Sequence, residues 1–400
     1  MEEVISGGIT AVPGIKATGV HCGIKGNKKD LALIYSPSPG VAAGVFTTNL
    51  IKAAPVLVSY RNIKEPVTRA IVVNSGNANA CSGERGRKDA ERMVELTAQH
   101  LDLDPSQVLV SSTGVIGQFL PMEAVEKGIK SACENLNEEG GTLAAEAILT
   151  TDTIKKERAY TFELLGKKIT IGAMAKGSGM IYPDMATMLA FITTDISISK
   201  PLLEKALQES VKSSYNLITV DGDTSTNDMV IIMANGMAGN PKITEEGEEY
   251  YKFVEALNFV NKEMSRIIIR DGEGTTKLIE VNIKGTTSYQ MGRRLAMGIL
   301  NSNLVKTAFF GEDANWGRII TAMGYSSGEF IPEQVDIYLE DLQVMKDGVG
   351  LQFDEDKARE ILSAREVKVF IDLKMGSGEI TAWGSDLSYQ YVTINSSYRS

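Results

Sequence analysis

The sequence predicts a mixed α/β protein, and three observations support this prediction. Short apolar runs typical of buried strands alternate with segments whose apolar residues recur at helical spacing. In the last third of the chain, apolar residues alternate with a period of two, as they do in half-buried strands. With 400 residues, 43% of them hydrophobic, the chain is long enough for two or three packed units with a sizeable core.

The first third of the chain is expected to hold two buried strands and one helix. Apolar runs at residues 70–73 and 108–110 predict the strands, and a loop of small polar residues follows each of them. Apolar residues at helical spacing predict a helix over about residues 86–102 with one buried face. Because functional residues concentrate on loops held by a rigid scaffold, the two strand ends are candidate functional positions.

Two further helices are expected in the middle of the chain. Ser199 followed by Pro201 is a helix start signal, and apolar residues at helical spacing follow it. A second three-four pattern covers residues 253–267 and ends at the turn signal Asp271-Gly272.

The last part of the chain is expected to be rich in strands. Period-two alternation at residues 279–283 and 367–373 predicts two of them. We therefore expect a strand-rich region over about residues 285–400, with a boundary near Lys284-Gly285. The sequence contains no internal repeat of fixed period and no low-complexity tract.

Charge and composition exclude several classes of function. Lys and Arg total 41 against 51 Asp and Glu, a net charge of −10, and no dense basic run offers a nucleic-acid surface. No segment approaches the roughly 18 apolar residues of a membrane span, and the start MEEVISGGIT lacks the features of a secretory signal. The three cysteines, Cys22, Cys81 and Cys133, form no CxxC pair, so we expect neither disulfides nor a zinc site. A cytoplasmic protein without membrane or nucleic-acid partners is expected.

The most unusual segment, residues 176–189, is glycine-rich at first and strongly apolar after Thr187. A hydroxyl residue at such a junction, preceded by the small Ala186, has its Oγ near the carbonyl carbon of its own peptide bond. If the backbone is bent there, an N to O acyl shift followed by hydrolysis would split the chain and leave Thr187 with a free α-amino group.

A terminal amine would supply the base that a threonine nucleophile needs. Its pKa of about 7.7 to 8.0 lets it take the hydroxyl proton near neutral pH. The chain contains only His21 and His100, and His100 closes a predicted helix, so a serine-histidine-acid triad would depend on His21 alone. On the residues alone, the pattern favours the plainer interpretation, a buried Thr187 at a strand edge.

The whole chain resembles a known family. The segment KGSGMIYPDMATMLAFITTD resembles the cleavage-site motif of the ornithine acetyltransferase (glutamate N-acetyltransferase) family of arginine biosynthesis. Six more blocks occur in the family's order: GGITAVPGIKATGV, FTTNLIKAAPV, VVNSGNANACSG, TVDGDTSTND, FFGEDANWGRI and the ending YVTINSSYRS. The resemblance implies a layered αββα fold similar to that of the N-terminal nucleophile hydrolases, with different connectivity.

The resemblance also implies the reaction. Cleavage between Ala186 and Thr187 gives an α chain of residues 1–186 and a β chain of residues 187–400, which stay together as a heterotetramer of two pairs. Thr187 then takes the acetyl group from N-acetylornithine, releases ornithine, and passes the acetyl group to glutamate to give N-acetylglutamate. No cofactor is implied, and whether acetyl-coenzyme A also serves as a donor stays open.

Family positions suggest roles for individual residues. Thr113 and Gly114 match the pair that stabilises the oxyanion, which suits a strand end where a glycine lets the backbone approach closely. Lys176 matches a substrate contact, and its ammonium suits the α-carboxylate that both substrates share. Thr150 matches another substrate position, although its neighbour Thr151 leaves that assignment open by one residue. The alternative interpretation of Thr113-Gly114 is an ordinary turn, and that of Lys176 is a solvated loop lysine.

Three further substrate positions and two departures complete the resemblance. Glu273 would accept a hydrogen bond from the ornithine ammonium, and Asn395 and Ser400 match the family's carboxyl-terminal contacts, where Ser400 replaces the usual Thr. Tyr182 and Asp184 stand where the family commonly has His and Asn, which puts the geometry of cleavage in question. A nearby Asp carboxylate would raise the pKa of the Thr187 amine.

Two other functions remain as alternatives. One is a self-processing aminopeptidase or amidase, in which water rather than glutamate resolves the acyl-enzyme. The other is a non-catalytic binder that keeps the fold but never cuts itself. The blocks at residues 74–79, 227–228 and 315–318 resemble the family too, but turn chemistry and subunit packing explain them as well as substrate contact does.

Overall fold

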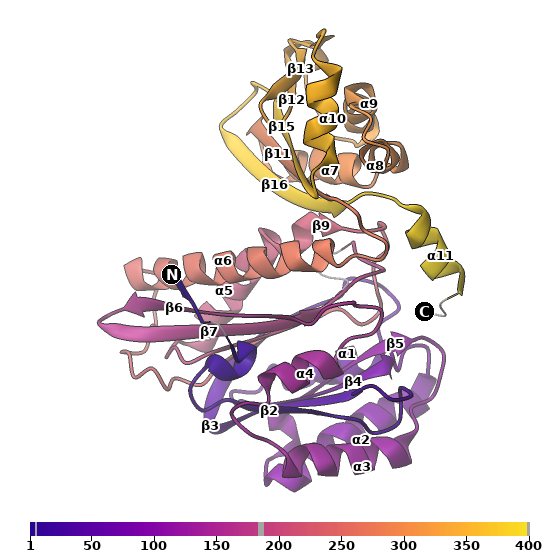
Figure 1. Ribbon diagram of the computed structural model, residues 1–400. Coiled ribbons are helices and arrows are strands. Elements are labelled where there is room, and N and C mark those ends of the chain that lie inside the picture. The colour runs from indigo at the N-terminus through magenta and orange to yellow at the C-terminus, as the bar shows by residue number, and fades with distance from the viewer. Residues whose placement is uncertain (5, 183–187, 398–400) are drawn as a thin grey trace.

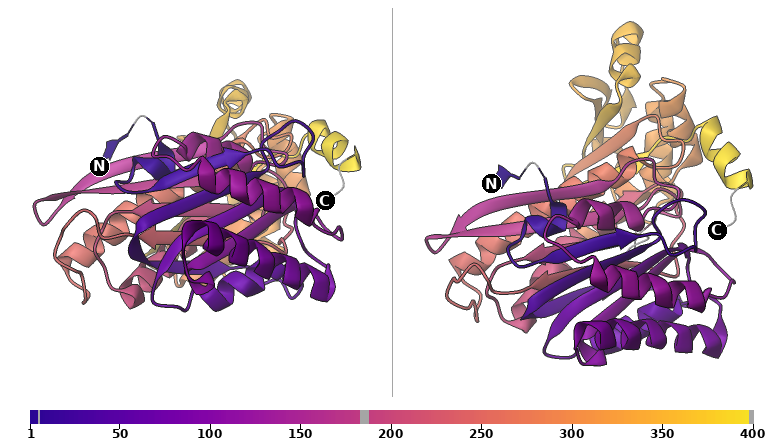
Figure 2. Two further views of the ribbon diagram at one scale, coloured as in Figure 1. Left: turned by 90° about the horizontal axis from the view of Figure 1, so that it is seen from below. Right: turned by 60° about the horizontal axis from the view of Figure 1, so that its bottom comes forward.

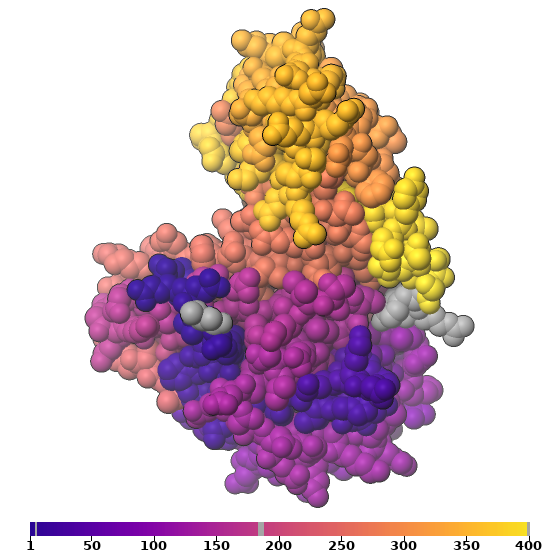
Figure 3. All heavy atoms as spheres, viewed as in Figure 1, coloured from indigo at the N-terminus to yellow at the C-terminus, as the bar shows by residue number. Residues whose placement is uncertain are grey.

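The computed structural model describes residues 1–4, 6–182 and 188–397. It confirms the mixed α/β class: a broad sandwich of strands and helices carries a second, narrower lobe built around its own sheet (Figure 1). The termini of the described chain lie on the sandwich side of the molecule, and the second lobe projects away from it (Figure 3).

One long strand connects the two layers of the sandwich. The first half of β3 (Leu31–Phe46) pairs with β2 (Lys16–Val20) and β4 (Thr68–Asn77), while its second half pairs with β10 (Met229–Ala234). The described strands of this sheet follow the order β1-β6-β7-β8-β10-β3-β4-β5, with β2 beside β3. The other members are β1 (Glu2–Glu3), β5 (Val108–Val115), β6 (Lys156–Leu164), β7 (Lys167–Lys176) and β8 (Leu189–Thr194).

Helices cover both outer faces of the sandwich, which confirms the four-layer αββα arrangement (Figures 1 and 2). Alternating side chains show the layers directly: Val72 packs towards the outer helices of its layer, whereas Ile71 and Val73 belong to the core between the two strand layers. One layer is covered by α5 (Lys200–Lys212) and α6 (Glu248–Arg270), and the other by α1 (Ala54–Asn62), α2 (Gly83–Leu101) and α3 (Met122–Glu134). The short α4 (Gly141–Ala147) contributes to the core between the layers.

The helix predictions hold because their end signals are local. Ser199 occupies the N-cap position of α5, and Pro201 lies in the first turn, where a missing N–H costs nothing. The apolar stripe of α6 packs into the buried cluster that it shares with α5, β6 and β7, which we call the main core. The helix ends at Arg270, directly before the expected turn. The expected helix at 86–102 is α2, which begins three residues earlier.

The second lobe contains a sheet that starts before the expected boundary. Lys284 and Gly285 lie inside β11 (Leu278–Thr286), and the sheet already includes β9 (Ile218–Thr219). Its order is β14-β13-β12-β15-β11-β16-β9, with β12 (Asp336–Leu339), β13 (Leu342–Lys346), β14 (Val349–Gly350), β15 (Glu366–Asp372) and β16 (Gly378–Ser385). Its helices are α7 (Tyr289–Leu300), α8 (Asn303–Phe310), α9 (Trp316–Tyr325) and α10 (Glu355–Ser363).

The chain returns to the sandwich through a last helix. After β16, α11 (Tyr389–Ser397) lies beside the sandwich at the foot of the second lobe (Figures 1 and 3). None of the helices in the described part of the chain combines the length and the apolar character needed to cross a bilayer.

Candidate active site

A pocket of about 160 Å³ opens near α11, where β5 and β7 end and β8 begins. Six of the residues predicted from the sequence line it together: Thr113, Gly114, Thr150, Lys176, Glu273 and Asn395. Met188 lines it as well, so the described chain resumes after Thr187 at the pocket wall. Ala186, Thr187 and Ser400, and the departure at Asp184, lie outside the described residues.

The end of β5 forms one wall through a glycine that no other residue can replace. Gly114 has a φ of +131°, and a Cβ there would lie 2.3 Å from the carbonyl carbon of Gly76. Just before it, Ser112 donates its hydroxyl to Asn74 Oδ1 at 2.5 Å, and the Asn227 amide donates to the Ser112 carbonyl oxygen at 2.8 Å. These bonds fix the backbone that carries Thr113 and Gly114, and they give the 74–79 and 227–228 blocks a structural role.

Lys176 is the last residue of β7 and lies almost buried beside Asp152. Its Nζ is 3.8 Å from Asp152 Oδ2, and burial lowers the pKa of the lysine although the nearby carboxylate opposes this. Burial alone would raise the pKa of Asp152, but Lys176 and Lys156 hold it well below its usual value. A buried carboxylate therefore stays ionised next to the candidate substrate-binding ammonium.

Sequence reasoning missed the buried ion network to which Asp152 belongs. The Lys156 ammonium lies between Asp152 Oδ1, at 2.6 Å, and the carboxylate of Asp271. Asp152 also accepts the backbone N–H groups of Thr150, at 3.0 Å, and of Gly177, at 2.7 Å. The network therefore joins the Thr150 turn, the end of β7 and the turn that carries Glu273.

The turn after α6 packs against the last helix. Asn395 donates its amide to Glu273 Oε2 at 2.8 Å, and Ser388 donates its hydroxyl to the Gly274 carbonyl at 2.6 Å. A Cβ on Gly274 would lie 2.4 Å from the Tyr391 nitrogen, so the close approach of α11 requires a glycine there. This packing places Glu273 and Asn395 side by side on the wall of the same pocket.

Asp221 is a second residue that sequence reasoning missed, within the TVDGDTSTND block. Its carboxylate accepts the backbone N–H groups of Met180, at 2.7 Å, and Ile181, at 2.8 Å, and the Tyr391 hydroxyl donates to it at 3.2 Å. Burial and the charge of Asp221 raise the pKa of Tyr391 above its usual value, so the phenol remains a donor. The sequence signal was only the clustering of small polar residues, which does not single out one carboxylate.

The pocket carries both signs of charge. Lys176 supplies an ammonium, while Asp221, Asp228 and Glu273 supply carboxylates. Neither histidine is among the described residues that line the pocket, and no cluster of three or more potential metal ligands occurs in the described ranges. Tyr182 packs partly buried against the main core. Such a pocket suits a zwitterionic ligand of amino-acid size rather than an apolar or polyanionic one.

The αββα sandwich and the pocket that carries both signs of charge fit an acyltransferase that acts on amino acids as the class of protein. The chain belongs to the ArgJ family, whose family model matches residues 16–400. This membership confirms the predicted family and its place in arginine biosynthesis.

Several named proteins are similar to this chain. An arginine biosynthesis bifunctional protein ArgJ from Symbiobacterium thermophilum is 52% identical over 400 residues, which cover 99% of this chain and 100% of that protein. The crystal structure of an arginine biosynthesis bifunctional protein ArgJ from Bacillus halodurans is 45% identical, with a TM-score of 0.52, and covers 53% of this chain and 100% of its own. An ornithine acetyltransferase from Mycobacterium tuberculosis, solved in complex with ornithine, is 36% identical, with a TM-score of 0.42, over 46% of this chain and 99% of its own.

Proposed function

We propose that this enzyme transfers an acetyl group from N-acetylornithine to glutamate through an acetyl ester on Thr187. The observation that carries the proposal is the convergence of six predicted residues, drawn from five separate parts of the sequence, on one pocket next to Met188. Because a random set of loop residues would not meet in this way, the convergence supports a common role in binding and catalysis.

Self-cleavage would create the nucleophile. The Thr187 hydroxyl attacks the carbonyl carbon of Ala186, the C–N bond breaks as the C–O bond forms, and the hydroxyl proton ends on the new amine. Water then hydrolyses the ester, which leaves a carboxylate on Ala186 and restores the Thr187 hydroxyl. The 53% share of this chain that the whole Bacillus halodurans chain covers supports the proposal, because residues 187–400 form a fragment of similar size.

Acetyl transfer would use the same groups twice. The Thr187 amine takes the hydroxyl proton while Oγ attacks the acetyl carbon, and the proton passes to the departing ornithine amine. The backbone and hydroxyl at Thr113 and Gly114 stabilise the oxyanion. In the second half, the glutamate amine attacks the ester carbon, and its proton passes through the Thr187 amine to Oγ as the C–O bond breaks. N-acetylglutamate then leaves, and the Thr187 hydroxyl is restored.

The two substrates share an α-carboxylate and differ in the charge of their side chains. Lys176 would bind the shared carboxylate, and Thr150 and Asn395 would add hydrogen bonds. Glu273 would face the ornithine ammonium, with water or mobile groups helping when the glutamate side chain enters the same space. The terminal Ser400 would complete the site.

Three finer features belong to the same proposal. The word "bifunctional" in the relatives' names supports a second reaction, for which we propose acetyl-coenzyme A as the donor to glutamate. The enzyme itself would need no cofactor. We further propose that the α and β fragments assemble as a heterotetramer and work in the cytoplasm.

The decisive experiment compares the intact protein with Thr187→Ala and with the control Thr321→Ala, an exposed threonine on the second lobe. Mass measurement under denaturing conditions should find fragments of 186 and 214 residues for wild type and control, but one 43.3 kDa chain for Thr187→Ala. Transfer from N-acetylornithine should vanish only in Thr187→Ala. An active wild-type chain that is uncut would overturn the proposal.

The same assay separates the alternatives. Steady acetate release from N-acetylornithine that glutamate leaves unchanged would support the amidase instead. Binding of N-acetylornithine by an uncut wild-type chain, without turnover, would support the non-catalytic binder. Glutamate supplied with acetyl-coenzyme A as the sole donor tests the second reaction.

A further inference from the structure

The segment of residues 220–229 contacts the chain before the proposed cleavage site. Within this segment, Asp221 accepts the N–H groups of Met180 and Ile181. The Val220 N–H donates to the Ile181 carbonyl at 2.7 Å. The Thr224 hydroxyl donates to the carbonyl of the next residue, Tyr182, at 2.9 Å. Four hydrogen bonds therefore fix three consecutive residues of this flank to one segment.

The same segment also fixes the chain after the cleavage site. The Met229 N–H donates to the Met188 carbonyl at 3.1 Å, and the parallel pairing of β10 with β8 starts there, with Met229 opposite Leu189. In the sequence, the Ala186-Thr187 bond lies between these two anchored flanks.

Elements on several sides hold the segment of residues 220–229 in place. Lys306, almost fully buried, donates its ammonium to the Val220 carbonyl at 2.7 Å. Two side chains from the loop after β3 also hydrogen-bond to its backbone. Thr47 donates to the Ser225 carbonyl at 2.7 Å, and Asn49 donates to the Thr224 carbonyl at 2.9 Å. The segment is therefore a rigid support for both flanks.

The flank that Asp221 holds is in a conformation that needs support. Met180 has a φ of +57°, in the left-handed region that costs a residue with a Cβ about 1–2 kcal/mol. Asp221 binds the N–H of this residue and of the next one, and hydrogen bonds to an ionised acceptor are about twice as strong as neutral ones. The carboxylate thus opposes relaxation of the backbone just before Tyr182.

We propose that Asp221 is a positioning residue for chain scission and that residues 220–229 hold both flanks of the scissile bond while Thr187 attacks Ala186. This inference rests on the self-cleavage proposed above. An attacking oxygen must stay within about 3–3.5 Å of the carbonyl carbon, so fixing the flanks raises the fraction of time spent in that arrangement. In this proposal Asp221 acts through the backbone that it holds, and not as an acid, a base or a nucleophile.

Cell-free translation tests the inference, because scission can be followed from the moment the chain is made. We expect Asp221→Asn to slow scission by about tenfold or more, since small misplacements of reacting groups cost up to about a hundredfold. Asp221→Glu, which keeps the carboxylate, should recover part of the rate. The matched control is Asp354→Asn, which changes a carboxylate that also accepts two backbone N–H groups but lies on the second lobe at α10. It should cut at the wild-type rate.

Stability is measured separately from scission by adding Asp221→Asn to the uncut Thr187→Ala chain and recording its thermal unfolding. A folded Asp221→Asn chain that cuts slowly supports the inference, and one that cuts at the wild-type rate overturns it. If Asp221→Asn does not fold, Thr224→Val decides: slower scission of about threefold supports the segment's role, and an unchanged rate overturns it. A wild-type chain that never cuts would instead overturn the proposed self-cleavage itself.

Discussion

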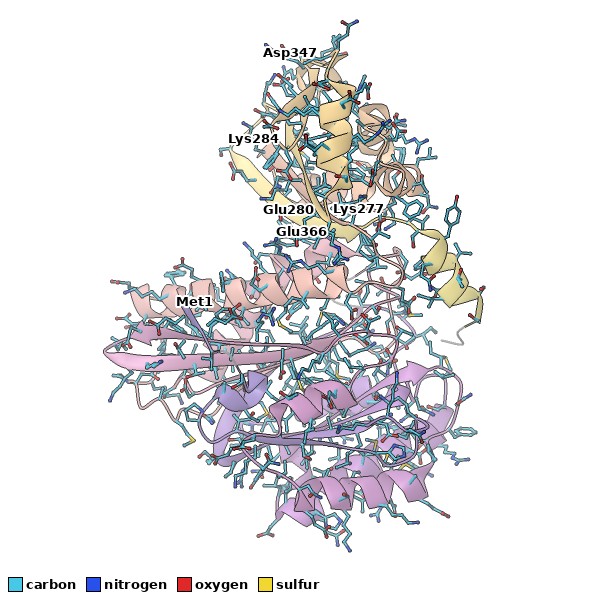
Figure 4. The ribbon with its side chains drawn as sticks, in the orientation of Figure 1. Met1, Lys277, Glu280, Lys284, Asp347 and Glu366 are labelled. Atoms are coloured by element: carbon cyan, nitrogen blue, oxygen red, sulfur yellow. The ribbon has the colours of Figure 1, made fainter. Side chains whose placement is uncertain are left out.

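Two lysines in different regions of the molecule make nearly the same contacts in opposite surroundings. Lys156, beside the pocket, is fully buried between Asp152 and Asp271. Lys374, on the second lobe, lies 2.8 Å from Asp336 and 2.6 Å from Asp347, with 34% of its side chain exposed. The labelled Asp347 lies at the outer end of that lobe (Figure 4).

The difference shows that burial, and not contact geometry, decides what such a lysine does. Away from water, removing one ion leaves its partners charged in a medium of low dielectric constant, so all three groups must be present. At the surface, water and salt screen the same contacts. The buried group can therefore hold the three pocket segments in register, whereas the exposed group joins only strands and turns of its own lobe.

The largest effect is expected for Lys156→Met, which leaves Asp152 and Asp271 buried without their shared ammonium. We expect the free energy of unfolding to fall by about 3–5 kcal/mol. Urea denaturation of the uncut Thr187→Ala chain, with and without the change, measures this without the complication of two fragments. A loss below about 1 kcal/mol would show that the buried group contributes no more than a surface ion pair.

The next largest effect concerns binding. Lys176→Met removes the ammonium proposed to hold the shared α-carboxylate, and losing one partner of a buried charged contact costs about 2–5 kcal/mol. We expect kcat/KM to fall by about a hundredfold for both N-acetylornithine and glutamate. Steady-state assays of protein confirmed to be cut provide the test. A loss confined to one substrate would contradict binding of the shared group.

A third buried lysine predicts a dependence on pH. Lys306 donates to backbone carbonyls, and its burial lowers its pKa from 10.5 to about 8. Between these values the unfolded chain holds the proton that the folded chain has lost, so the free energy of unfolding rises with pH, by at most about 1.4 kcal/mol per pH unit. Below pH 8 the contribution is constant.

The comparison with Lys306→Met isolates this slope. Urea denaturation of both proteins in the uncut Thr187→Ala background, at pH 7, 8, 9 and 10, should give a difference that grows only above pH 8. Other groups that titrate in this range occur in both proteins and cancel. A difference independent of pH would show that Lys306 keeps its proton when folded.

The smallest effect is expected for Lys374→Met. Because water screens its contacts with Asp336 and Asp347, the urea midpoint should change within the error of the measurement, and added salt should change it no further. Transfer activity should also stay at the wild-type level. A loss as large as that of Lys156→Met would break the comparison between the two regions.

Periodicity and end signals in the sequence predicted the strands around residues 70 and 108 and the helices α5 and α6, because these signals are local. The family resemblance named six residues that the structure brings together in the pocket, while the roles given to them stay predictions. The buried ion network was not predicted, because Asp152 and Asp271 are far apart in the sequence and nothing local marks their contact. The early start of the second sheet was also missed, since β9 has only two residues and no period of its own.

The strand order of the sandwich has a consequence for a cut protein. Two pairs of neighbouring strands, β7 with β8 and β10 with β3, each have one strand before the Ala186-Thr187 bond and one after it. After scission, one sheet would therefore contain strands of two separate polypeptides. Neither polypeptide could complete that sheet by itself. Renaturation after scission would become a bimolecular encounter whose yield depends on protein concentration, whereas the newborn chain folds in a single-molecule step. The chain would therefore fold once as a single molecule, before scission, and after scission it could refold only when the two fragments meet.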